Sequence, residues 1–248
     1  EIYTLSLHDA LPILCHQLNA IVRSVCKNKT FKSMSDIVVS RTAYRFTDLM
    51  HKDHPEAIGQ LSEGHSYDVS TNIFERLPQV FFDDKPDDGN DYIRILGRMN
   101  NSRTMKFVRR DYIREVENLD GYKVFMAKAN GTGAFGETLT PPIVGEPSVG
   151  NTETFISIGE FYTLSEAMAL KKYIATKFVR ALLGALKTTQ DITPEKWKFV
   201  PQQDFSEASD IDWSRSVEEI DAFLYKKYKL TDAEICFINE KVQAMKDV

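Results

Sequence analysis

The sequence lacks an apolar run long enough to cross a bilayer. A membrane-spanning helix needs about 20 predominantly apolar residues in a row. The most apolar helical stretch is interrupted by charged side chains, namely Lys171, Lys172, Lys177 and Arg180. We therefore expect a soluble protein without a membrane partner.

Cysteine is scarce, and its spacing excludes two classes of small stabilised domain. Cys15, Cys26 and Cys236 lie far apart and form no CxxC pair, which argues against both a disulfide framework and a zinc knuckle. The segment His51–Glu56 (HKDHPE) holds two histidines, but Pro55 interrupts it and no matching ligand cluster occurs elsewhere. We expect no metal site, and a reducing cytoplasm as the location.

Positive charge is not in excess over the whole chain. The 31 Lys and Arg residues face 36 Asp and Glu residues, which gives a net charge of −5 and speaks against a generic nucleic-acid binder, because phosphate contacts require cations. The distribution is uneven, however. Asp83–Asp91 (DDKPDDGND) is an acidic, turn-rich loop. The following stretch, Tyr92–Lys128, is basic, with Arg94, Arg98, Arg103, Lys106, Arg109, Arg110, Arg114, Lys123 and Lys128.

The usual catalytic motifs are missing. No GxSxG turn is present to carry a serine nucleophile, and Pro86-Asp87 is not followed by the D/E-x-K of restriction nucleases. The Asn/Asp-Pro-Pro-aromatic motif of adenine methyltransferases is absent too, since Thr140-Pro141-Pro142-Ile143 lacks both the amide or acid and the aromatic side chain. We therefore assign no catalytic residue.

Three glycines match the G-x-G-x-x-G pattern of dinucleotide-binding turns. Gly131, Gly133 and Gly136 follow an apolar strand, but the motif also needs a helix directly after it to bind the pyrophosphate. The prolines at Thr140–Pro142 prevent such a helix. We assign no cofactor-binding residue, and expect the glycines to allow a close approach of the backbone or an irregular loop.

The apolar pattern predicts a sheet followed by helices. Tyr92–Arg98 and Thr104–Ile113 alternate around Met99–Ser102, as in a hairpin with one buried face. Tyr122–Ala127 and Glu153–Gly159 indicate two further strands. Thr163 and Glu166 form a capping box that begins a long helix, whose core face holds Ala167, Leu170, Ile174, Phe178, Ala181 and Ala185.

The opposite side of that helix carries a basic stripe of Lys172, Thr176, Arg180 and Lys187. It is either a solvated face or a face that follows phosphates. From Asp204 onward the chain is acidic, and the pairs Ser216/Glu219 and Thr231/Glu234 mark two short helices. The length allows one large domain or a domain with a helical appendage. The predicted fold is α/β (α+β), with a mixed or antiparallel sheet, a long helix packed on it and a C-terminal helical tail.

Several segments resemble the C-terminal target-recognition region of type II restriction-modification adenine-specific DNA methyltransferases. The resemblance runs from about Ser35 to the end of the chain, and Trp197–Leu230 is its most specific part. The matching segments are Ser35–Phe46 (SDIVVSRTAYRF), Tyr122–Glu137 (YKVFMAKANGTGAFGE), Glu153–Phe161 (ETFISIGEF), Tyr173–Asp191 (YIATKFVRALLGALKTTQD), Trp197–Phe205 (WKFVPQQDF), Ser209–Leu230 (SDIDWSRSVEEIDAFLYKKYKL) and the closing AEICFINEKV.

The resemblance implies a parent enzyme whose upstream domain binds S-adenosylmethionine and methylates adenine at N6, with or without restriction endonuclease activity. This chain would be a fragment that supplies sequence recognition and binds double-stranded DNA. Residues 1–13 look like a non-native translated adapter, residues 14–34 like a remnant of the upstream region, residues 35–205 like the target-recognition domain and residues 206–248 like the helical tail.

An enzyme that flips a base out of the duplex needs a separate surface to hold the flanking DNA. Hairpin cations, the polar loop around the glycines and the helix stripe could supply it, since phosphate contacts position and base-edge contacts specify. The predicted DNA-binding residues are Arg98, Arg103, Lys106, Arg109, Arg110, Lys128, Asn130, Thr132, Thr154, Lys172 and Arg180. The alternative is a protein-interaction module whose acidic C-terminal helices dock on a partner or on an upstream domain.

Overall fold

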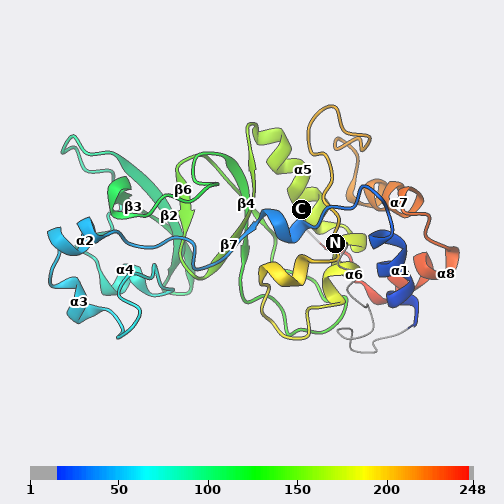
Figure 1. Cartoon of the computed structure of the whole chain (residues 1–248), viewed down its shortest axis with the longest axis horizontal. Coiled ribbons are helices and arrows are strands. Elements are labelled where there is room, and N and C mark those ends of the chain that lie inside the picture. The colour runs from blue at the N-terminus through cyan, green and yellow to red at the C-terminus, as the bar shows by residue number, and fades with distance from the viewer. Residues whose placement is uncertain (1–15, 246–248) are drawn as a thin grey trace, which may run out of the picture. The chain divides into compact units, whose positions relative to one another are not determined.

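A computed structural model describes residues 16–245, so the expected adapter at residues 1–13 lies outside the described residues. The chain forms two compact units (Figure 1). The sheet unit comprises Ile37–Ala129 and Pro142–Met168. The helical unit comprises residues 16–36, Asn130–Pro141 and residues 169–245 of the described chain. Residues 206–245 therefore belong to the same unit as residues 169–205, rather than forming a separate tail.

The sheet unit holds two sheets, which confirms the predicted α+β class with antiparallel and mixed pairing. The first is antiparallel, in the order β1 (Val38–Val39), β7 (Phe155–Phe161), β4 (Tyr122–Ala127) and β5 (Ile143–Gly145). The second is mixed: β2 (Tyr92–Met99) lies between antiparallel β3 (Ser102–Arg109) and parallel β6 (Val149–Asn151). Short helices precede or follow these strands, namely α2 (Asp48–Asp53), α3 (Ala57–Gln60), α4 (Ile73–Arg76) and the 3₁₀ turn Arg110–Tyr112.

The β2–β3 hairpin forms where the alternating pattern predicts it. Its strands pair without a bulge from Tyr92↔Arg109 to Met99↔Ser102. Asn100 and Asn101 form the turn with φ of 50° and 62°, the left-handed backbone that a two-residue type I′ turn requires and that Asn tolerates. One face of the hairpin packs into a core cluster that includes Ile93, Ile95, Val108, Phe46, Phe74 and Phe81.

A buried lysine ties together the loops of the sheet unit. Lys123 is fully buried, and its ammonium donates hydrogen bonds to the carbonyl oxygens of Leu119 at 2.8 Å, Glu146 at 3.2 Å and Val149 at 3.0 Å. Burial lowers the pKa of Lys123 to about 8, against the attraction of Asp120 and Glu160. The side chain remains mostly protonated at neutral pH, and the three carbonyls satisfy its three donors.

The helical unit is built from α1 (His16–Cys26), the end of α5 (Leu164–Ala175), α6 (Lys177–Gly184), α7 (Val217–Lys227) and α8 (Asp232–Lys241), with a 3₁₀ turn at Pro194–Trp197. Both predicted C-terminal capping boxes are present at the starts of α7 and α8. The apolar positions of these two helices, Ile220, Leu224, Ile238 and Val242, are buried. No helix among the described residues has the length and apolarity needed to cross a membrane.

The single long helix predicted after Thr163 is two helices. Its predicted capping box is confirmed, because Thr163 N–H donates to Glu166 Oε2 at 3.0 Å and Glu166 N–H to Thr163 Oγ1 at 3.3 Å. The helix ends at Ala175, however, and Thr176 adopts an extended backbone and caps α6 by accepting from Val179 N–H. Apolar spacing continues across this break, which is why the pattern did not reveal it.

We predict that Lys123→Met lowers the free energy of unfolding by about 3 kcal/mol, because it leaves buried carbonyls without a donor. Lys85→Met, at an exposed position, is the matched control and should change stability by less than about 0.5 kcal/mol. Urea denaturation followed by tryptophan fluorescence and circular dichroism measures both. Equal stability of the two variants would show that the three hydrogen bonds contribute nothing.

Candidate nucleic-acid interface

The tip of the β2–β3 hairpin exposes a group of cationic and amide side chains. We define the hairpin tip as residues 97–104. Arg98, Asn100, Asn101, Ser102 and Arg103 are all exposed. Among the described residues, the tip is two-stranded, since β6 pairs with β2 only at residues 94–96 and the bridge beside β3 lies at Phe107.

Arg98 and Arg103 occupy directly opposite positions on the two strands. Like charges in such a cross-strand pair are destabilising, so an anion close to both would relieve the repulsion. Arg98 Nη2 donates to the backbone oxygen and to Oδ1 of Asn101, both at 3.3 Å. Beside the tip lies an open hollow of about 310 Å³ lined by Thr71, Asn72, Glu75 and residues 98–101.

Two further predicted residues lie at the same end of the sheet unit. Thr152 N–H donates to the carbonyl of Leu96, just before the tip, at 2.9 Å, and Lys128 N–H donates to the carbonyl of Thr154 at 2.9 Å. These two hydrogen bonds place Thr152 beside Leu96 of β2, and the residue after β4 beside the residue before β7. We call this group, Arg98, Arg103, Lys128 and Thr154 with the two turn asparagines, the hairpin end.

The cations at the opposite end of the hairpin are paired with acidic side chains. Arg109 contacts Asp111 at 2.6 Å and Asp53 at 3.4 Å, Arg110 contacts Asp120, and Lys106 contacts Asp83 at 2.6 Å. Their side chains are only 22%, 28% and 11% exposed. Asp111 raises the pKa of Arg109, and Asp120 raises that of Arg110. These three predicted contacts are therefore largely neutralised within the sheet unit.

The glycine loop of the helical unit already binds an anion, the side chain of Glu137. This carboxylate accepts hydrogen bonds from Thr132 N–H at 2.7 Å, Thr132 Oγ1 at 2.9 Å and Gly133 N–H at 2.8 Å. The ammonium of Lys187 contacts it at 2.6 Å. Burial raises the pKa of Glu137, but Lys187 and the loop donors outweigh this and lower it to about 2.

The close backbone approach predicted for the glycines is confirmed, and it is an approach of the chain to itself. A Cβ at Gly133 would lie 2.8 Å from the backbone of Thr189, and one at Gly136 would collide with the carbonyl of Lys241. All three glycines have positive φ. The regular element that follows the glycines is strand β5, and not the helix that a dinucleotide-binding turn needs at this position.

Asn130, which precedes the first glycine, is buried, and its Oδ1 accepts from Thr140 N–H at 2.8 Å. Since Thr132 binds Glu137, both predicted loop contacts hold the loop together. The Nδ2 of Asn130 is buried without a hydrogen-bond partner within the described chain, whereas the other polar side-chain atoms of these two residues bind within the loop.

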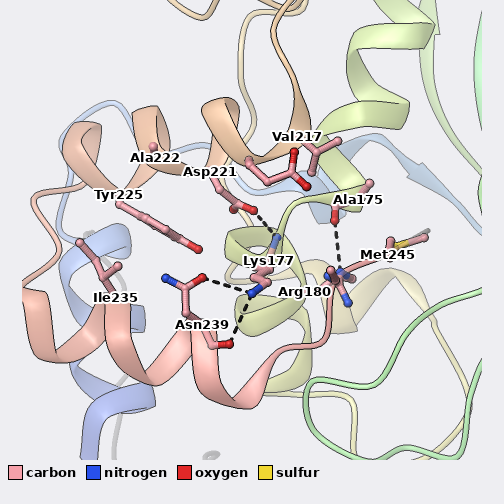
Figure 2. A pocket seen from close by; sticks show the side chains of 12 residues that line it. Ala175, Lys177, Arg180, Val217, Asp221, Ala222, Tyr225, Ile235, Asn239 and Met245 are labelled. Atoms are coloured by element: carbon pink, nitrogen blue, oxygen red, sulfur yellow. Dashed lines mark hydrogen bonds between the residues drawn. The ribbon is translucent and has the colours of Figure 1, made fainter. Parts of the chain in front are cut away.

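A cavity of about 290 Å³ in the helical unit surrounds another predicted residue, Arg180 (Figure 2). Arg180 is 3% exposed and donates to the carbonyls of Ala175 at 3.3 Å and Glu137 at 3.4 Å, and to that of Gln243. In the same cavity Lys177 Nζ donates to Asn239 Oδ1 at 3.2 Å (Figure 2). Both cations thus serve the packing of the helical unit.

Asp221, also in this cavity, caps the first turn of α6 by accepting from Lys177 N–H and Phe178 N–H, each at 2.8 Å. Burial raises the pKa of Asp221 to about 6, although these amide bonds oppose the shift. A carboxylate at a helix N-terminus is stabilised by the helix dipole. This contact fixes α7 against α6.

The prediction that the basic stripe forms an exposed surface is wrong. Thr176, Arg180 and Lys187 are buried, because the helix breaks at Thr176 and its polar residues turn inward to cap neighbouring chain segments. The half-buried Lys172 donates to the carbonyls of Trp213 at 2.9 Å, Ser214 at 3.3 Å and Arg215 at 3.1 Å. The stripe therefore stabilises the helical unit.

The structure thus separates the predicted residues by environment. Arg98 and Arg103 are exposed at the hairpin tip, and Lys128 and Thr154 are half-buried. Lys106, Arg109 and Arg110 contact acidic side chains, and Asn130, Thr132, Lys172 and Arg180 bind other groups of the helical unit. Sequence reasoning identified Asn100 and Asn101 only as turn formers, although the exposed amides of a hairpin turn next to two arginines were a usable signal. No group of three His, Cys, Asp or Glu side chains within residues 16–245 is arranged to hold a metal ion.

Comparison of the chain with protein-family models, with curated proteins and with solved structures finds no match.

The Glu137 contacts predict a pH dependence of stability. A carboxyl whose pKa is lower in the folded chain than in the unfolded one stabilises the fold above the unfolded pKa, and this contribution is lost as the pH falls through the folded pKa. For Glu137 the window runs from about 4.5 down to about 2. We expect Glu137→Gln to cost about 1–3 kcal/mol at pH 7 and almost nothing at pH 2.

Urea denaturation between pH 2 and pH 7 measures this difference, with Glu207→Gln, at an exposed position, as the control. A destabilisation by Glu137→Gln that is the same at every pH would mean that the carboxylate charge is not what holds the loop.

Proposed function

We propose that the chain is the DNA target-recognition part of an adenine-specific DNA methyltransferase or combined restriction-modification enzyme. The observation that carries the proposal is the hairpin end, where exposed arginines and amides gather on a two-stranded ribbon. Hydrogen bonds from Arg, Asn and Thr side chains are the contacts by which proteins hold and read a duplex. The resemblance of the sequence to this enzyme family supports the same assignment.

Some cations of the sheet unit are paired with acidic side chains and others lie at the hairpin end. This difference supports a localised contact with DNA rather than a general attraction. The chain has a net charge of −5, and Lys106, Arg109 and Arg110 are neutralised by acidic partners. In this proposal, attraction to phosphates therefore comes from cations other than these three. We propose that the hairpin end provides them, with Lys128 and Thr154 contacting the backbone.

Methyl transfer itself belongs, in this proposal, to an upstream domain of the same polypeptide that binds S-adenosylmethionine. Flipping an adenine out of the duplex leaves the flanking base pairs to be held by another surface, which is the task assigned to this chain. We assign it no cofactor. A cytoplasmic location follows from a DNA substrate in a bacterial type of enzyme.

A second candidate function is docking on another protein domain, and one observation favours it. Tyr162, Leu164 and Met168, at the start of α5, are 97%, 51% and 42% exposed. Such a local group of exposed apolar side chains is typical of an interaction site. Of the apolar positions in the acidic C-terminal segment, Phe223 is 37% exposed, while Ile220, Leu224, Ile238 and Val242 are buried within the helical unit.

We predict that the full chain binds double-stranded DNA in a salt-dependent manner, and that Arg98→Ala/Arg103→Ala weakens binding by about tenfold or more. The slope of log affinity against log salt concentration should also become shallower, by about 1–2. Fluorescence anisotropy with labelled 25-base-pair duplexes of random sequence, between 50 and 300 mM salt, measures both quantities.

The matched control is Lys52→Ala/Lys85→Ala, which removes the same number of charges from exposed positions of the same unit. Its affinity should stay within about threefold of the unaltered chain. Equal losses in both variants would reduce the interaction to net charge, and an absence of DNA binding at 50 mM salt would refute the proposed function.

A further inference from the structure

We infer that the hairpin tip enters the major groove and reads guanine through Arg98 and Arg103, which would make these two arginines specificity-determining residues. This inference rests on the proposed function and extends it, from binding a duplex to recognising a class of DNA word. Three features support it: the side chains on each face of the hairpin, the width of the hairpin, and the hydrogen bonds between Arg98 and Asn101.

The two faces of the hairpin have different roles. Side chains alternate along a strand, so Arg98, Arg103 and Met105 share one face, and Ile93, Ile95 and Val108 lie on the other, within the core cluster. Met105 is 39% exposed. On the face that carries both arginines, Leu96 is buried in a second core cluster, whereas Arg98, Arg103 and Met105 at the tip are exposed. Met105 is an apolar side chain next to the arginines that suits contact with a thymine methyl group.

The width of the tip favours base edges over phosphates. Two paired strands lie about 4.8 Å apart, whereas the major groove is about 12 Å wide, with phosphates at its walls. A ribbon inserted into the groove therefore carries both arginines towards its floor. Opposite side chains on the two strands have Cβ atoms about 5 Å apart. Base pairs are stacked about 3.4 Å apart along the DNA axis, so two long arginine side chains at this spacing can reach neighbouring base pairs.

The chemistry of arginine then selects the base. A guanidinium presents a planar pair of N–H donors, and guanine is the base with two acceptors, N7 and O6, side by side in the major groove. Asn101 accepts from Arg98 Nη2 with both its backbone oxygen and Oδ1. This contact holds the guanidinium beside the turn in the free chain, and Nη2 exchanges Asn101 for a guanine acceptor when DNA binds.

Substitution of the two arginines by lysine separates base recognition from the effect of positive charge on DNA binding. Arg98→Lys/Arg103→Lys keeps both positive charges but loses the planar fork, so the variant should still bind DNA with a weaker preference for guanine. The preferred word is first selected from a pool of random duplexes with the unaltered full chain. Affinities of the chain and the variant are then compared on that word and on the same word with each guanine replaced in turn by 7-deazaguanine, which lacks N7.

We expect the selected words to share at least one guanine whose 7-deaza replacement weakens binding of the unaltered chain about tenfold. The same replacement should weaken binding of the lysine variant by about threefold or less, because an ammonium lacks the paired donors of the fork. Replacement by inosine, which keeps N7 and O6 but lacks the minor-groove amino group, should have little effect on either protein. Lys52→Arg/Lys85→Arg, at exposed positions away from the tip, serves as the control and should select the same words.

Two results would overturn the inference while leaving the proposed function intact. One is salt-dependent binding whose selected words are indifferent to 7-deazaguanine, and the other is sensitivity to inosine alone, which indicates reading from the minor groove. A chain that binds no duplex at low salt would overturn the proposed function and this inference with it.

Discussion

The bulge-free pairing of β2 with β3 is the constraint on which the candidate interface depends. Because side chains alternate along each strand, a slip of one residue would exchange the face of Arg98 and Arg103 for the face of Ile95 and Val108. Two features prevent that slip, namely the left-handed turn at Asn100–Asn101 and the burial of the apolar face. The same register that builds the core of the sheet unit thus places the arginines together on the outside.

In both units, charged side chains form hydrogen bonds with backbone groups of the same unit. Lys123 donates to three carbonyls, Glu137 accepts from the amides of the glycine loop, and Asp221 accepts from the first amides of α6. Buried ionic groups require such partners, because an unpaired charge in the interior is costly. These contacts explain why motifs that resemble ligand sites, a glycine loop and a helix N-terminus, are occupied by side chains of the chain itself.

The difference between the cations that contact acids and those at the hairpin tip has the same physical origin. Lys106, Arg109 and Arg110 face acids that come from the loop before β2, from α2 and from the segment before β4. Arg98 and Arg103 lie next to the turn, where the hairpin is only two strands wide. The proposed DNA contact therefore relies on the exposed tip rather than on these three paired cations.

Local patterns in the sequence were sufficient for the strands at Tyr92–Arg109 and Tyr122–Ala127, for the turn at residues 100–101 and for three capping boxes, because each depends on residues close together in the chain. They could not reveal the break at Thr176, the burial of Arg180 and Lys187 or the acidic partners of Arg109 and Arg110. Those depend on segments such as residues 53, 120, 137 and 221 that only the tertiary fold brings near. Sequence alone determined the hairpin, the strand at Tyr122–Ala127 and the capping boxes, and the tertiary structure decided the helix break at Thr176 and the burial of Arg180 and Lys187. The physical reason is that the partners of buried charges, such as Glu137 for Lys187, lie far away along the chain.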